Sequence, residues 1–356
     1  MHFFKHFEIS EANNLNIFYY YLIFIYFFIE LRYMTIKEIS LITGLSPATI
    51  SRALSNPNLV KSYTKERIMQ AINEKNNSFL KELNILVPDT SSFPSNEIIN
   101  HVVNYLCDEE VEIVLYSSKN DLNLENRIID RINSKKHNNS VLFWYPIEYE
   151  RKKDFIYPSI PTIVLYHNFY VNKSNSNVLY INFSKLVEMT ASLLYKGGAQ
   201  KLLILINHDE NSYPGNNIKR LYIDYITAYC PLLNRLEFLF FPGSNWNDVY
   251  HLLNQKYNNN FPFDSIISLS SSIAYGVVTF LKIKKLSIPN DVSIITFGYD
   301  LGFELMTQPI SMIYPDTQKA AEHIIYMAAQ LIENNNYSES INLNLQSTLL
   351  GSERKY

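Results

Sequence analysis

Short apolar runs alternate with amphipathic helical patterns along most of the chain after residue 84. Residues 83–87 (LNILV) predict a buried strand, and residues 97–110 predict an amphipathic helix. A strand followed by a helix and another strand produces parallel sheets that are covered on both faces. We therefore expect an α/β core of two doubly wound parallel sheets, one in each of two lobes. The further strands are expected at 111–116, 140–145, 161–166, 178–182, 201–206, 235–241, 264–269 and 291–297.

The composition is that of a folded protein with more than one domain. The chain has 356 residues, a formal net charge of −3 and 47% hydrophobic residues, which excludes a disordered chain and a globally basic nucleic-acid coat. Its two cysteines cannot form a disulfide framework, so a reducing compartment, the cytoplasm, is expected. Cys107 and Cys230 each lie beside apolar residues and are expected to be buried thiols.

Residues 1–33 differ from the rest of the chain. Ile17 to Ile29 form one apolar run of 13 residues, whereas a membrane-spanning helix needs about 20. No small-residue cleavage site follows the run, as a secretory signal would require. We expect an apolar extension outside the fold, with Met34 as the true start and no membrane attachment. A membrane tether remains the alternative.

A helix-turn-helix pattern begins directly after Met34. Thr35 followed three residues later by Glu38 is a capping box that opens a helix. Gly44 supplies the left-handed residue that ends this helix in a tight turn. Ser46 and Pro47 then open a second helix, as N-cap and first helical residue.

The second helix is predicted to have a buried and an exposed face. Its inward residues are Ile50, Ala53 and Leu54. Its other face consists of small or polar residues and one arginine: Pro47, Ala48, Ser51, Arg52 and Ser55. Thr64 is expected to cap a third helix that turns Ile68, Ala71 and Ile72 inward.

Local charge supports nucleic-acid binding by this head. Residues 34–75 carry six Lys or Arg against three Glu, about +3, although the whole chain is negative. The second helix of a helix-turn-helix can enter the DNA major groove, and its small exposed side chains allow close approach to base edges. The alternative is a purely structural three-helix bundle with a solvated polar face.

The stretch TIKEISLITGLSPATISRALSN, from residue 35, resembles the N-terminal head of the LacI/GalR family of transcriptional regulators. The resemblance implies that Pro47, Ala48 and Arg52 touch base edges, with Arg52 bound to guanine, and that Leu59 lies near the groove. It also implies a set of residues that hold phosphates: Thr35, Ser46, Ser51, Ser55 and Thr64.

The connection between head and core departs from the family pattern. Family members carry Tyr-x-Pro-Asn and Ala-Arg-x-Leu motifs in a segment that forms a hinge helix and inserts Leu into the minor groove. Here residues 75–84 (KNNSFLKELN) lack both motifs and are roughly a dozen residues shorter than that pattern. Either recognition uses the major groove alone, or Phe79 and Leu80 belong to a degenerate hinge.

The order of core elements also resembles this family, whose core is periplasmic-binding-protein-like and binds its ligand between the lobes. Val87-Pro88-Asp89 matches the end of the family's first strand. The resemblance implies a head at 34–75, a linker at 76–84 and an effector-binding and dimerisation core at 85–350. Lobe 1 is expected at 85–197 plus 314–336, and lobe 2 at 198–313 plus 337–350.

The match is weakest at the effector site. Trp246 lies where the family often places an aromatic platform for a sugar or a base, and the alternative is a core Trp at a helix start. Arg220 is one residue out of register with the family's cleft Arg. These departures indicate a different effector, a weaker one or none. The expected effector residues are Ser91, Ser92, Trp246, Ser270, Ser271 and Asp300.

No enzyme motif, cofactor loop or metal-ligand pattern is found in the sequence. His208-Asp209-Glu210 is interpreted as a solvated loop rather than acid–base machinery. We expect a dimeric repressor of a metabolic operon that binds a palindromic double-stranded DNA operator. Its DNA affinity is expected to depend on a small molecule, a sugar or sugar derivative, between the lobes. The alternative is an exported solute-binding protein of a transporter, for which a helix-turn-helix would have no use.

Overall fold

The computed structural model consists of two units, residues 1–80 and 81–356. The residues it describes are 35–55, 60–76, 80–91, 93–135, 139–147, 158–167, 177–211, 213–241, 245–258, 260–334 and 337–349. The N-terminal extension and its apolar run lie outside these ranges. None of the helices among the described residues is both long and apolar enough to cross a membrane.

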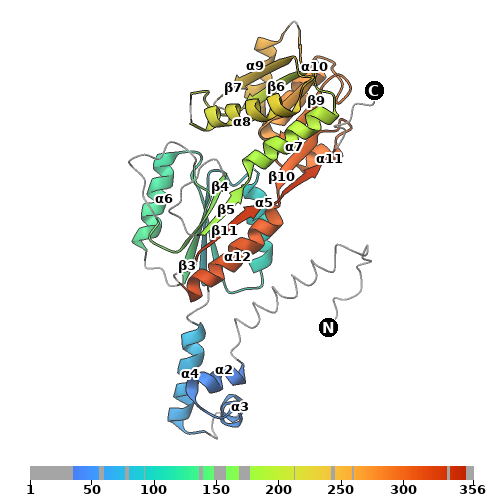
Figure 1. Cartoon of the computed structure of the whole chain (residues 1–356). Helices are drawn as coiled ribbons and strands as arrows, with labels where there is room; N and C mark the ends of the chain where they lie inside the picture. The colour runs from blue at the N-terminus through green and yellow to red at the C-terminus, as the bar shows by residue number, and fades with distance from the viewer. Residues whose placement is uncertain are drawn as a thin grey trace. The chain divides into compact units, whose positions relative to one another are not determined.

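The first unit is a head of three packed helices (Figure 1). They are α2 (Ile36–Thr43), α3 (Pro47–Ser55) and α4 (Ser62–Asn76). Ile39, Ile50, Ala53 and Ile68 form its buried core, and the last three of these were predicted to face inward. Leu54 was expected to face inward but is 48% exposed, because helices this short bury only a narrow apolar stripe.

The third helix begins earlier than the sequence suggests. Thr64 was expected to be its N-cap, yet the helix starts at Ser62, whose hydroxyl donates to Glu66 Oε1 over 2.7 Å. Ile68 and Ala71 are buried as predicted, whereas the side chain of Ile72 lies outside the described residues.

The second unit contains two six-stranded sheets, each covered by helices on both faces (Figure 1). The first sheet has the order β11-β5-β4-β3-β1-β2, and every pairing in it is parallel. Its strands are β1 (Glu82–Val87), β2 (Glu112–Ser117), β3 (Ser140–Trp144), β4 (Thr162–His167), β5 (Asn177–Ile181) and β11 (Glu339–Leu343). Its helices are α5 (Ser95–Leu106), α6 (Leu122–Ser134) and α12 (Thr317–Glu333).

The second sheet has the order β12-β10-β9-β8-β6-β7 and is parallel except for β12. Its strands are β6 (Lys201–Ile206), β7 (Arg235–Phe240), β8 (Ser265–Ser268), β9 (Ser293–Phe297), β10 (Ser311–Pro315) and β12 (Leu345–Thr348). Helices α7 (Phe183–Lys196) and α8 (Tyr213–Tyr229) bury one face. Helices α9 (Trp246–Lys256) and α10 (Ser271–Ile283) bury the other, and the short α11 (Leu301–Leu305) follows β9.

The expected fold class, a small helical head and an α/β core of two lobes, each built on a parallel-dominated sheet, is therefore confirmed. Two details of the lobe boundaries differ from expectation. Helix α7 was assigned to lobe 1, but its apolar face packs against strands of the second sheet. Residues 337–350 were assigned to lobe 2, but β11 pairs with β5 of the first sheet and only β12 joins the second. The expected linker also overlaps both α4, which reaches Asn76, and β1, which starts at Glu82.

The chain passes between the lobes three times, each time through one residue. Asn182 separates β5 from α7, Asp316 separates β10 from α12, and Asn344 separates β11 from β12. The last two crossings are bonded together, because the Asp316 N–H donates to the Asn344 carbonyl over 2.9 Å. The Asp316 side chain also caps α12 and accepts a 2.9 Å hydrogen bond from Gln346 Nε2. These three residues are the connections between the lobes.

Both cysteines are free thiols, but only one is buried. Cys230 lies in the core between α7 and α8, where burial raises the pKa of its thiol. Cys107 was expected to be buried and is instead exposed at the end of α5. Apolar neighbours along the chain did not bury it, because they belong to the inner face of the helix.

Candidate functional site

Local hydrogen bonds fix the ends of the first two helices of the head. The Glu38 N–H donates to Thr35 Oγ1 over 3.2 Å, and the Thr35 N–H donates to Glu38 Oε2 over 2.7 Å. These two bonds form the predicted capping box. Gly44 ends the helix at φ 63°, a left-handed conformation that glycine adopts without a steric penalty. Ser46 then caps α3 by accepting from the Thr49 N–H over 3.2 Å.

The solvent-facing side of α3 has the predicted composition. Arg52 lies in the last turn and forms no ion pair with any described residue. Ser55 donates back to the Ser51 carbonyl over 2.8 Å, so its hydroxyl is held close to the helix. Small side chains around one arginine leave the helix backbone open to close approach by a partner. The exposed residues of this face are Pro47, Ala48, Ser51, Arg52 and Ser55.

Three other residues expected to contact DNA lie off α3 or outside the described chain. Thr35 is exposed at the start of α2. Thr64 is half-buried in the first turn of α4, where it is not the helix cap. Leu59 lies outside the described residues.

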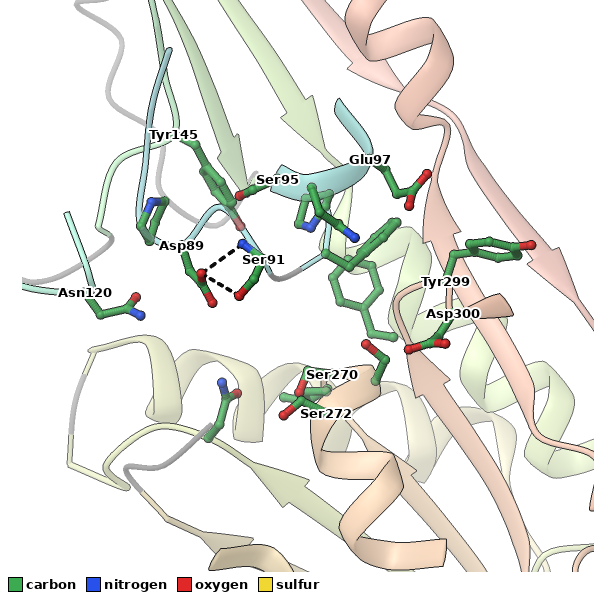
Figure 2. A pocket seen from close by; sticks show the side chains of 18 of the residues that line it. Asp89, Ser91, Ser95, Glu97, Asn120, Tyr145, Ser270, Ser272, Tyr299 and Asp300 are labelled. Atoms are coloured by element: carbon green, nitrogen blue, oxygen red, sulfur yellow. Dashed lines mark hydrogen bonds between the residues drawn. The ribbon is translucent and has the colours of Figure 1, made fainter. Parts of the chain in front are cut away.

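A cavity of about 780 Å³ lies between the two lobes of the second unit (Figure 2). On lobe 1 it is lined by residues just beyond β1 and β3, including Asp89 and Tyr145. On lobe 2 it is lined by residues just beyond β6, β8 and β9, including His208, Ser270 and Asp300. These positions are the carboxyl ends of the strands, where open α/β sheets bind ligands.

Polar side chains on both sides of the cavity are held in place by their own hydrogen bonds. Asp89 Oδ1 accepts from the N–H and the hydroxyl of Ser91, over 2.9 and 2.8 Å (Figure 2). Ser270 caps α10 by accepting from the Ile273 N–H over 3.3 Å. Asp300 caps α11, accepting from the Gly302 N–H over 2.8 Å.

Aromatic side chains from both lobes also border the cavity. Trp246, the first residue of α9, is 49% exposed and lines the cavity, which rules out the alternative of a core Trp. Phe93 of lobe 1 packs edge-on against Phe297 and Tyr314 of lobe 2, with ring centroids 6.3 and 6.4 Å apart. Gly298, at φ 112°, allows this contact, because a Cβ there would lie 3.3 Å from the Phe93 ring.

His208 is part of this cavity, so its interpretation as a solvated loop residue is wrong. It is half-buried just beyond β6, and burial lowers the pKa of its imidazole. Asp209 and Glu210 are exposed, as expected of a loop. The imidazole is therefore neutral near pH 7 and can donate or accept a hydrogen bond.

Comparison with known proteins connects the two units. Residues 35–77 match the family model for bacterial regulatory proteins of the lacI family, and residues 191–349 match the model for a periplasmic-binding-protein-like domain. A transcriptional regulator of the helix-turn-helix type from Lachnoclostridium phytofermentans is 24% identical over 285 residues, which cover 75% of this chain and 84% of the relative. The chain belongs to the LacI family of bacterial regulatory proteins.

Solved structures of the LacI family share the fold at low sequence identity. A LacI-family regulator from Enterococcus faecalis V583 with bound ribose superposes with a TM-score of 0.62 at 15% identity, covering 78% of this chain and 100% of that one. A lac repressor dimer bound to operator and the anti-inducer ONPF superposes with a TM-score of 0.61 at 11% identity, covering 90% of this chain and 99% of that one. The relatives matched are transcriptional regulators, not enzymes.

In this LacI-family chain, the cavity gathers most of the expected effector residues. Ser91, Trp246, Ser270, Ser271 and Asp300 all line it, whereas Ser92 lies outside the described residues. Several other lining residues were not predicted from the sequence. They could have been found because they lie at the ends of predicted strands or closely follow them, and open α/β sheets bind ligands at the carboxyl ends of their strands. These are Asp89, Asn120, Tyr145, Asn207, His208 and Tyr299.

The family's cleft arginine has no counterpart among the described residues of the cavity. Arg220 is exposed on α8 and does not line it. No Lys or Arg occurs among the lining residues that the structure describes, which include three carboxylates: Asp89, Glu97 and Asp300.

Proposed function

We propose that this LacI-family regulator is a cytoplasmic repressor of a metabolic operon, with operator affinity set by a sugar or sugar derivative between its lobes. The observation that carries the proposal is the interlobe cavity, in a chain whose head exposes one face of a capped helix. A ligand that contacts both lobes binds most tightly to one arrangement of them and so shifts the population toward it.

The proposed DNA contacts follow from side-chain chemistry. Pro47, Ala48 and Arg52 are placed at base edges, with Arg52 donating to O6 and N7 of a guanine. Leu59 is placed near the groove. Polar side chains that contact phosphates are proposed to fix the register, and these are Thr35, Ser46, Ser51, Ser55 and Thr64.

The proposed ligand contacts combine aromatic and hydrogen-bonding groups. Trp246 offers an exposed ring on which the apolar face of a sugar can stack. Asp300, Ser270 and Ser271 follow two neighbouring strands, and Ser91 belongs to the facing lobe. Ser92, the next residue in the sequence, stays a proposed contact. The related Enterococcus faecalis regulator was solved with ribose bound, which supports a sugar in this cavity.

A homodimer on a palindromic operator is proposed for a geometric reason. One short helix contacts only a few base pairs, whereas a two-fold pair reads two half-sites about one helical turn apart. The lac repressor structure that shares this fold is a dimer on its operator. An exported solute-binding protein is disfavoured, because residues 35–77 match a DNA-binding head.

The test is selection of bound duplexes from a random library by the full chain. We expect enrichment of a palindrome whose half-sites lie about 10 base pairs apart, centre to centre. The Ser51→Glu variant is the control, because it places a negative charge on the exposed face of α3 without touching the head's core. Failure of the unmodified chain to enrich any sequence would contradict the proposed function.

A further inference from the structure

The interlobe cavity has an unusual charge balance for a site that binds a small polar molecule. Asp89, Glu97 and Asp300 line it, and all three are half-buried. Among the described lining residues no Lys or Arg offsets them. Burial also favours the neutral form of His208, so the imidazole adds no positive charge near pH 7.

In two of these carboxylates, one of the two oxygens is held by hydrogen bonds from the protein. Asp89 Oδ1 is held by Ser91, and Asp300 Oδ1 by Tyr275 and the Gly302 N–H. Oδ2 of each carboxylate receives no hydrogen bond from the described residues. Each therefore keeps an accepting oxygen whose direction is already fixed.

A neutral acceptor adds to the same pattern. Asn96, which lines the cavity in the first turn of α5, has a buried Oδ1 with no hydrogen-bond partner among the described residues. A buried acceptor without a partner costs about 1–3 kcal/mol unless a donor reaches it. The accepting oxygens of Asp89, Asp300 and Asn96 thus favour a ligand with many hydrogen-bond donors.

Aromatic rings of the cavity favour the same ligand. Trp246 exposes about half of its surface there, and Tyr299 lies beside Asp300 (Figure 2). The faces of Trp and Tyr rings attract cations as well as the C–H faces of sugars. Carboxylates next to aromatic faces are a common way for proteins to bind an ammonium group.

We propose that the ligand between the lobes is a hydroxylated amine, such as an amino sugar, whose ammonium group is bound by these carboxylates. This inference rests on the proposed function, because it specifies the ligand of the same cavity. A phosphorylated sugar is excluded, since its charge would face three carboxylates with no basic residue among the described lining. A neutral sugar can form hydrogen bonds with the polar groups of the cavity, but it leaves the negative charge of the three carboxylates unbalanced.

The test compares amines with their neutral and phosphorylated counterparts. The probes are glucosamine, galactosamine and mannosamine, each against the parent sugar, the N-acetyl form and the 6-phosphate of the parent. Binding to the full chain is measured by calorimetry and thermal shift at about pH 6.5, where such amines are protonated. We expect at least one amine to bind about tenfold or more tightly than its neutral counterparts, the size of one charge-assisted hydrogen bond, and the phosphates not to bind.

Variants of the carboxylates make the comparison specific. Glu97→Gln keeps the shape of the side chain but removes its charge, and should reduce the preference for the amine to a few-fold at most. Asp224→Asn, on the exposed surface of α8 away from the cavity, is the matched control and should leave the preference unchanged.

Three results would overturn the inference: equal or better binding of a parent sugar, binding of a 6-phosphate, or no binding of any amine in the panel. DNA binding by the same preparation is measured without ligand. Loss of DNA binding alone contradicts the proposed function and leaves the ligand result standing, so the two failures are distinguishable.

Discussion

The hydroxyl of Tyr275 donates a 2.8 Å hydrogen bond to Oδ1 of Asp300. Tyr275 lies on α10 and Asp300 caps α11, so this bond ties α10 to the start of α11 at the wall of the cavity. The same carboxylate oxygen accepts from the Gly302 N–H over 2.8 Å. The orientation of Asp300 therefore depends on Tyr275 as well as on its own helix.

Tyr275→Phe should lower the free energy of unfolding by about 1–2 kcal/mol, because Asp300 loses a hydrogen bond. Burial, followed by the bond to Asp300, raises the pKa of Tyr275 to about 12, so the folded protein keeps the phenol protonated beyond its ordinary range near pH 10. This stabilisation is complete below about pH 10 and disappears as the pH rises toward 12. Chemical unfolding of both proteins between about pH 8 and pH 12 should show the difference narrowing only above pH 10; a constant difference would contradict this account.

His208→Gln should make stability less sensitive to mild acid. The unfolded chain protonates its histidines near pH 6.5, but burial lowers the pKa of folded His208. Its stabilising contribution is therefore complete above about pH 6.5 and is lost as the pH falls below it. Burial also lowers the pKa of His323, which remains in both proteins and so cancels in the comparison. If the free energy of unfolding changes equally in the two proteins from about pH 8 to pH 5, His208 has no such role.

Gly276→Ala should disturb the position of Trp246. A Cβ at Gly276 would overlap the Trp246 carbonyl oxygen and lie 2.7 Å from Val249 Cβ, so α9 must move away from α10. Such overpacking lowers the free energy of unfolding by about 1–3 kcal/mol, and we expect weaker ligand binding as the indole shifts. Ile283→Ala, at an exposed position of the same helix, is the control and should change both quantities little. Unchanged affinity in Gly276→Ala would show that Trp246 does not contact the ligand.

Arg52→Ala should weaken binding to the selected operator by about 1–3 kcal/mol and affect random duplex much less. The reason is that a guanine contact depends on sequence, whereas a phosphate contact does not. Lys65→Ala, which removes an exposed positive charge from α4, should weaken binding to both DNAs about equally. Equal losses on both DNAs for Arg52→Ala would make Arg52 a phosphate contact.

The two thiols should react with a labelling reagent at clearly different rates. Cys107 is exposed, whereas Cys230 is buried and has a raised pKa. Since the thiolate is the reactive form, we expect one fast thiol and one at least about tenfold slower. Cys107→Ser should remove the fast phase, and its persistence would contradict the burial of Cys230.

Of the strands that the structure describes, the sequence predicts nine, including the edge strands β2 and β7, and misses β10, β11 and β12. Central strands of a parallel sheet are buried on both faces and so appear as uninterrupted apolar runs. Strands β11 and β12 lie at sheet edges, and most of their residues are not buried. Their polar residues therefore hide them from a search for apolar runs.

The lobe of α7 was not predictable for a different reason. A linker rich in Gly or Pro would mark a crossing, but the crossing before α7 consists of a single residue, Asn182. Asn182 is an ordinary N-cap, accepting from the Lys185 N–H over 2.9 Å, so nothing in the local pattern distinguishes it from a turn within one lobe. His208 was misinterpreted on similar grounds, because a polar residue after a strand resembles a solvated loop until the facing lobe is known.

The three single-residue crossings at Asn182, Asp316 and Asn344 also determine which fragments of this gene can yield a folded product. Each lobe is assembled from segments that are interrupted by the other, so no single cut separates them. A chain that stops before Thr317 lacks α12 and β11, and leaves the first sheet without an edge strand and a covering helix. The head, in contrast, ends before the core begins. The head is therefore one continuous segment that a single cut separates from the core, whereas no single cut separates the two lobes.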